Sequence, residues 1–197
     1  MEKFSLERAL SLESKYDDSL QTRPIGNWLA TFVLWFSVFF ALYHYVTAGI
    51  GVPVDYWHMG AHMSGVIILI FISFPAFKKL KGKGQSPDLK GRLAGVPFYD
   101  WLFIIVGVMS SLYVGVTWYG IDLNFLGFSY SIPEQGLRMG VPLPIDVVFG
   151  TLLIIVLLEA VRRTIGIIVP IIILCFTGYA VLGPYIPIQI LKHPGLS

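Results

Sequence analysis

Charged residues are scarce in this chain, and their scarcity excludes most classes of soluble protein. Of the 197 residues, 13% are charged and 55% are hydrophobic, whereas soluble domains carry about 25% charged residues. The mean hydropathy of +0.73 exceeds what one soluble core of this size could bury. A formal net charge of +2 is too small to hold a nucleic acid by electrostatic attraction. The composition therefore indicates an integral membrane protein.

Cysteine and catalytic motifs are scarce as well. The single cysteine, Cys175, lies inside an apolar run and cannot form an intramolecular disulfide. The sequence contains no clustered nucleophile, acid–base pair or metal motif, so we do not expect an enzyme. No apolar stretch carries an ionisable residue near its middle, where transporters usually build their substrate sites. These absences predict a helical scaffold without a substrate, metal or cofactor site of its own.

Five apolar stretches are long enough to cross a bilayer, which takes about 20 helical residues. We therefore expect an all-α membrane protein with its helix bundle in residues 28–185 and a short tail in residues 186–197. The predicted spans are approximately residues 28–46, 59–77, 99–118, 145–161 and 165–185. The intervening outer segment, residues 119–143, is too polar to span and too apolar for a free linker. We expect it to fold onto the membrane surface or to meet a partner.

The basic residues predict the orientation of these spans. Twelve of the fourteen Lys and Arg residues lie before the first span, between the second and third, or between the fourth and fifth. Cytoplasmic loops carry the excess of positive residues, so we expect the N-terminus in the cytoplasm and the C-terminus outside. Within residues 1–27, apolar residues recur near helical spacing, which favours a short amphipathic helix on the cytoplasmic surface. A frayed tail is the alternative.

Five charged residues stand near the ends of the predicted spans. Asp100 opens the third span and Asp146 opens the fourth. Exposed backbone N–H groups and the helix dipole favour a carboxylate there, so we predict that both are helix caps. Glu159 precedes Arg162 and Arg163 by three and four residues, which predicts a structural ion pair on one helix face. A proton relay or a contact with another subunit remains open for Glu159.

Three histidines support a different hypothesis. His44 lies late in the first span, and His58 and His62 lie one helical turn apart at the start of the second. Antiparallel helices would bring His44 and His62 to a similar depth, as bis-histidine haem ligation requires. The chain could then be a haem b membrane anchor of an oxidoreductase. Hydrogen bonds between the helices, within an ordinary aromatic belt, are the simpler interpretation.

Small residues recur along the third span. Gly107, Ser111 and Gly115 are spaced every fourth residue. This spacing places them on one face of a helix, where small side chains let a neighbouring helix approach closely. We therefore predict a helix-packing face rather than a ligand site.

The fourth and fifth spans also carry a pattern that resembles a known family. The matching residues are Asp146–Gly150, Leu158–Gly166 and Tyr179–Tyr185, preceded in the same order by Tyr16-Asp17, Thr22-Arg23, His62 and Tyr99-Asp100-Trp101. They resemble the N-terminal part of TAXI-type TRAP permeases, the membrane components of tripartite ATP-independent periplasmic transporters, in the fused form called 4TM/12TM. The most specific part is the Leu-Glu-Ala-x-Arg-Arg string with its following glycine.

The resemblance implies a role in organic acid uptake across the bacterial inner membrane. In this family a periplasmic binding protein delivers the solute to a permease of two parts, and transport is often coupled to sodium. The large part holds the substrate and sodium sites and moves as an elevator. The small part enlarges the static scaffold and helps to dock the binding protein. The chain would be this small, Q-type subunit or the leading portion of a fused permease, surrounded by lipid and without nucleic acid.

The outer segment holds our candidates for contact with the binding protein. They are Asp122, Glu134 and Arg138, the charged residues of residues 119–143. Solvated loop charges are the alternative interpretation. No substrate or sodium ligand of the family has a matching position in this chain.

Overall fold

The computed structural model of the protein describes residues 23, 25–52, 54–76, 92–125, 127–138, 140–187, 189, 192 and 194. The amphipathic helix that we expect in the N-terminal segment falls, up to residue 22, outside this part of the chain. The long helices are α2 (Asn27–Ile50), α3 (Asp55–Ser73), α4 (Phe98–Thr117), α5 (Pro144–Thr164) and α6 (Ile168–Leu182), the last continued by the 3₁₀ turn η3 (Gly183–Tyr185). All five are long and apolar enough to cross a membrane. This confirms the expected set of five apolar helices.

The helix bounds differ from the expected spans by one to four residues, and α2, α3 and α5 each extend beyond an expected end. At two other boundaries backbone geometry keeps the helix shorter than its apolar run. α3 ends at Ser73 rather than near residue 77. The next residue, Phe74, is extended (φ −106°, ψ 125°), since a residue before proline, here Pro75, is disfavoured in the helical region. α6 begins at Ile168 rather than at residue 165, because Gly166 adopts a φ of 109° and separates it from α5.

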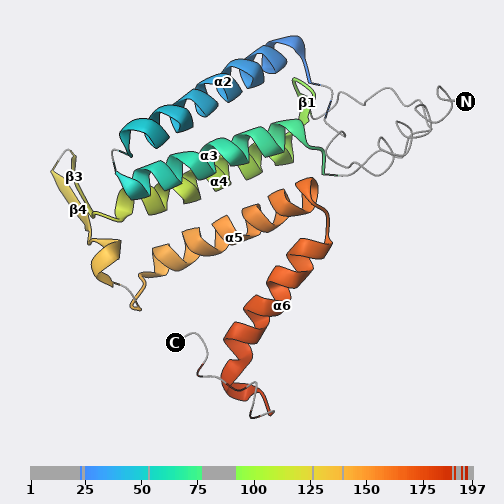
Figure 1. Ribbon diagram of the computed structural model, residues 1–197. Coiled ribbons are helices and arrows are strands. Elements are labelled where there is room, and N and C mark those ends of the chain that lie inside the picture. The colour runs from blue at the N-terminus through green and yellow to red at the C-terminus, as the bar shows by residue number, and fades with distance from the viewer. Residues whose placement is uncertain are drawn as a thin grey trace, which may run out of the picture.

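Helices α3 and α4 lie side by side at the centre of the molecule (Figure 1), and small residues set how closely they approach. A Cβ added to Gly60 would lie 3.0 Å from the carbonyl oxygen of Ser111, and one added to Gly115 would lie 2.9 Å from that of Tyr56. The Ser111 hydroxyl donates to the Gly60 carbonyl at 2.8 Å. A Cβ on Gly107 would lie 2.8 and 3.0 Å from side chains of α5 and α3. The small face of α4 is therefore in contact with its neighbours.

The apolar core lies where α3, α4 and α5 meet the start of α2. Its buried members are Leu29, Ile67, Phe71, Ile72, Val96, Ile104, Val156 and Ala160. The outer helices contribute little to it, since α2 buries only Leu29 and Thr47 and α6 buries only Pro170. In Figure 1, α6 also diverges from α5. The apolar side chains of α2 and α6 thus face outward, as in helices that contact lipid or another membrane protein.

The connection from α4 to α5 forms a β-hairpin. β3 (Ile121–Phe125) pairs antiparallel with β4 (Phe128–Ile132), and Gly127 supplies the left-handed turn with a φ of 85°. The 3₁₀ helix η2 (Gln135–Arg138) follows and leads to α5. Our sequence analysis did not identify these strands in the outer segment, although apolar and polar residues alternate along β3.

A second, shorter hairpin precedes α4 at the opposite end of the bundle (Figure 1). It consists of β1 (Arg92–Leu93) and β2 (Val96–Pro97). We name the two ends after the aspartates in the first turns of α4 and α5. The Asp100 end holds the start of α2, the end of α3 and the end of α5, and the Asp146 end holds the β3–β4 hairpin and η2.

Candidate functional site

The Asp100 end contains a buried ion cluster of five residues: Arg23, Asp100, Glu159, Arg162 and Arg163. Asp100 and Arg163 have fully buried side chains, and their Oδ1 and Nη2 atoms lie 2.7 Å apart. Arg23, just before α2, pairs with the other carboxylate oxygen of Asp100. Glu159 accepts hydrogen bonds from Arg162 Nε at 2.7 Å and from Arg163 Nε at 2.8 Å. The cluster therefore joins the chain before α2 to α4 and α5.

The same arginines also contact the end of α3. Arg23 and Arg163 each donate to the Phe74 carbonyl at 3.3 Å, and Arg162 donates to the Ala76 carbonyl at 2.8 Å. Both carbonyls belong to the residues that follow α3, where the chain is no longer helical, so the guanidinium groups supply hydrogen bonds that the helix ladder does not. The Arg163 guanidinium also lies 4.4 Å from the centroid of the Phe71 ring, a cation–π distance. Four segments of the chain thus meet in one charged contact, although Arg23 Nη1, Asp100 Oδ1 and Arg163 Nη2 are buried without a hydrogen bond to any residue that the structure describes.

Asp100 does not act as the helix cap that its position predicts. α4 begins after Pro97, and no side chain makes a capping hydrogen bond there. The Asp100 carboxylate instead faces Arg23 and Arg163. Two buried guanidinium groups are stronger partners for a carboxylate than backbone N–H groups, because their charge is complementary and the site excludes water. Sequence spacing alone gave no signal for these pairs, since Arg23 and Asp100 are 77 residues apart.

The Asp146 end holds a smaller polar cluster. Asp146 accepts a hydrogen bond from the backbone N–H of Leu143 at 2.7 Å, so its side chain caps α5 as its position predicts. It also accepts from the Tyr113 hydroxyl at 2.6 Å and pairs with Arg138. The hydrogen bond from the Arg138 guanidinium to the Asp146 carboxylate raises the pKa of Arg138 above its ordinary value. Tyr113 was missed in the sequence, where a lone tyrosine in an apolar run resembles any belt aromatic.

The three candidate docking residues are not equivalent. Arg138 is committed to the bundle, since it pairs with Asp146 and donates from Nε to the Pro133 carbonyl at 3.1 Å. Only 13% of its side chain is exposed. Asp122 and Glu134 are exposed, and Asp122 accepts a hydrogen bond from Ser131 across the hairpin at 2.6 Å. Of the three, the structure leaves the two carboxylates facing solvent.

The histidines of α2 and α3 meet in the half of the bundle nearer the Asp146 end. His44 Nε2 lies 2.5 Å from His62 Nδ1, and His44 Nδ1 lies 2.9 Å from the Phe40 carbonyl oxygen. Because a carbonyl only accepts, His44 Nδ1 donates there, and neutral His62 then donates from Nδ1 to His44 Nε2. The Tyr43 hydroxyl and His58 Nδ1 form a second contact at 2.8 Å.

This arrangement does not fit bis-histidine haem ligation. An iron atom between two axial imidazoles needs one nitrogen of each ring directed at it from opposite sides. The facing nitrogens of His44 and His62 are instead in direct hydrogen-bond contact. The contacts are those of hydrogen bonds between two helices, the simpler of the two interpretations.

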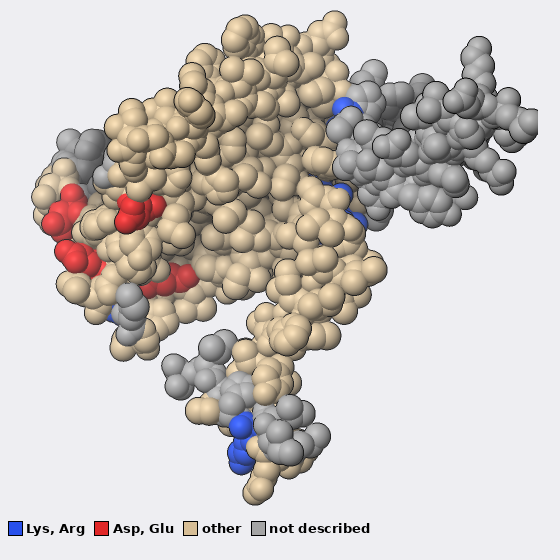
Figure 2. All heavy atoms as spheres, viewed as in Figure 1, with Lys and Arg blue, Asp and Glu red and all other residues tan. Residues whose placement is uncertain are grey.

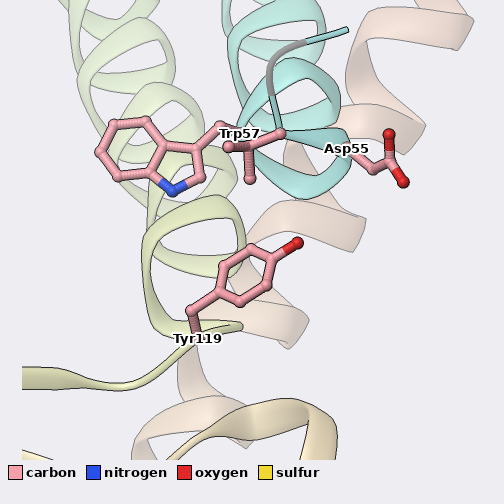
Figure 3. A pocket seen from close by; sticks show the side chains of 4 residues that line it. Asp55, Trp57 and Tyr119 are labelled. Atoms are coloured by element: carbon pink, nitrogen blue, oxygen red, sulfur yellow. The ribbon is translucent and has the colours of Figure 1, made fainter.

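One open depression lies at the Asp146 end. It is lined by Val54, Asp55, Trp57 and Tyr119 and has a volume of about 470 Å³. Figure 3 shows the Trp57 indole and the Asp55 carboxylate on opposite sides of the start of α3, with the Tyr119 ring below and between them. Asp55 carries no signal in the sequence, because it lies between two apolar runs. Only the structure shows that Asp55 and Tyr119, which are far apart in the sequence, line the same depression.

Comparisons with known proteins give no relative for this chain: no protein-family model, no curated protein and no solved structure matches it.

Proposed function

We propose that this chain is the small scaffold subunit of a TRAP-type importer of organic acids in the bacterial inner membrane. One observation carries the proposal. Every Asp, Glu, Lys and Arg of the described helices lies within the first or last two turns, and His62 of α3 is the one histidine of their middle sections, where it contacts His44. A chain that moves a charged solute needs polar groups near the middle of its helices. We therefore expect the solute pathway to lie in another subunit, with this chain packed against that subunit.

The pairing of the charged groups supports the same role. Asp100 and Glu159 are both engaged by arginines. Sodium binds oxygen atoms that are free to coordinate it. The oxygen atoms of these carboxylates already face arginines, so they are poor sodium ligands. Solute and sodium binding therefore belong to a large transport subunit, and this chain contributes packing and position.

The exposed helices give that large subunit a place to bind. On α2 the outward side chains include Trp35 and Phe39, 55% and 64% exposed, and on α6 they include Phe176, 70% exposed. Such apolar faces suit lipid or a second membrane protein. Docking of a soluble binding protein falls to the Asp146 end, where the hairpin and exposed carboxylates lie.

Purification of the tagged chain from native membranes in mild detergent tests the proposal. We expect a larger multi-spanning protein to co-purify in a fixed ratio, identified by mass spectrometry. If the chain emerges alone, or with a soluble redox subunit, the proposal is wrong. A second test is Glu159→Gln, which should weaken assembly of the complex more than its affinity for solute. A normal complex that no longer transports would instead assign Glu159 a direct part in coupling.

A further inference from the structure

The Asp146 end carries carboxylates that have no cation to balance them. Among the described residues, Asp55, Asp122 and Glu134 make no ion pair. Arg138 is the only Lys or Arg of residues 119–143, and Asp146 already takes it. Figure 2 shows the acidic side chains gathered at this end of the molecule, with little blue among them, and further basic side chains at the opposite end and on the tail after α6. The end is therefore an acidic surface.

The depression beside Asp55 adds aromatic walls to this charge. Trp57 and Tyr119 are 54% and 52% exposed, so about half of each ring is open to an incoming group. The Tyr119 ring is packed from one side, because Tyr56, which stacks on Trp118 with ring centroids 3.6 Å apart, meets it edge-on at 6.3 Å. The Tyr119 ring lies between the Trp57 indole and the Asp55 carboxylate (Figure 3). A cation in the depression is therefore attracted by the ring faces, and the Asp55 charge on one side of the start of α3 adds to that attraction.

From these contacts we infer that the depression lined by Val54, Asp55, Trp57 and Tyr119 receives a lysine or arginine side chain of a soluble protein partner. The inference rests on the proposed function, under which that partner is the periplasmic binding protein. It assigns the partner a basic contact surface. It also replaces Arg138 by Asp55 among the residues that make the contact.

The extent of the surface favours a protein over a lipid headgroup. Beyond the depression, exposed apolar side chains lie near the acidic ones on the hairpin, in η2 and after it: Phe128, Leu137 and Val141 are 80%, 82% and 76% exposed. The hairpin also projects past the ends of the helices (Figure 1), where lipid tails would not reach. Aromatic and apolar groups within a charged rim are typical of protein interfaces. An anionic lipid would be repelled by the three carboxylates.

Photo-crosslinking within the intact complex in its native membrane tests this inference. The variant Trp57→p-benzoylphenylalanine places the probe in the depression, and Trp35→p-benzoylphenylalanine is the matched control on α2, since Trp35 is 55% exposed. We expect the probe at position 57, and not the control, to label a soluble protein in a peptide that contains Lys or Arg. Adding Asp55→Asn should lower the yield about fivefold, which corresponds to about 1 kcal/mol of binding free energy.

Three results would overturn the inference: labelling only of lipid, including phosphatidylethanolamine; labelling only of the large subunit; or a yield that Asp55→Asn leaves unchanged. These results are separable from failure of the proposed function, which is measured by co-purification of the large subunit. If that subunit co-purifies and the probe labels no soluble protein, the inference alone is wrong. If it does not co-purify but the probe labels a basic soluble protein, the surface is correct and the transporter assignment is wrong.

Discussion

Asp100 and Asp146 occupy matching positions, each in the first turn of a long helix, yet the two ends of the molecule use them differently. The Asp100 carboxylate is fully buried between two arginines that also hold the end of α3. Asp146 caps its own helix and takes one arginine, while the other carboxylates of its end remain at the surface. At the Asp100 end the charged side chains hold segments of the chain together, whereas at the Asp146 end most carboxylates face solvent.

The largest expected effect comes from removing one partner of the buried pair. Arg163→Met leaves the Asp100 carboxylate facing only Arg23. Loss of one partner from a buried ion pair costs about 3–5 kcal/mol when no other partner remains, so we expect a loss up to that size. Thermal unfolding in detergent measures the loss. The control is Arg162→Met, because its side chain is 30% exposed and such pairs contribute much less. Equal losses in the two variants would show that the Asp100 end does not depend on buried charge.

The next effect tests helix contact near the Asp146 end. Gly115→Ala places a Cβ 2.9 Å from the Tyr56 carbonyl oxygen, which must push α3 and α4 apart and should cost about 1–3 kcal/mol. Gly150→Ala is the matched control in α5, where an added Cβ meets nothing within 4 Å. The control should be neutral or slightly stabilising, since alanine favours a helix. A neutral Gly115→Ala would mean that the helices do not approach this closely.

Arg138→Gln should destabilise the protein less than Arg163→Met does. Asp146 keeps its hydrogen bonds from Leu143 and Tyr113 when the guanidinium is removed. Because the folded-state pKa of Arg138 is raised, its stabilising contribution is fully present below the unfolded pKa and disappears only at strongly alkaline pH. The difference in melting temperature between wild type and Arg138→Gln should therefore stay constant between about pH 6 and 9. If the difference in melting temperature vanished between these pH values, the ion pair between Arg138 and Asp146 would not be the source of the stabilisation.

The smallest effect on stability is expected at the exposed carboxylates. Asp122→Asn retains an oxygen that can accept the Ser131 hydroxyl hydrogen bond, so unfolding should change by no more than about 0.5 kcal/mol. Glu134→Gln should behave alike. If either variant unfolds markedly more easily than wild type, the exposed carboxylates stabilise the fold, and charge then has a structural role at both ends of the molecule.

The sequence predicts those features that depend on neighbours along the chain. Long apolar runs indicated the five helices, and the three- and four-residue spacing from Glu159 indicated its contacts with Arg162 and Arg163. Pairs from distant segments left no such signal, so the position of Asp100 suggested a cap when Arg23 and Arg163 are its partners. The β3–β4 hairpin was missed for a different reason: apolar and polar residues alternate in both strands, but each strand has only five residues and lies between long apolar runs.

The buried pair at the Asp100 end also has a consequence for biosynthesis. Arg163 is synthesised 63 residues after Asp100, which at about 5–20 residues per second is a delay of several seconds. During that interval Asp100 has only Arg23 as a partner from the cluster. The charge cluster is thus complete only once α5 has been synthesised, and a chain truncated before that point lacks the contact of Arg163 with Asp100 and those of Arg162 and Arg163 with the segment after α3.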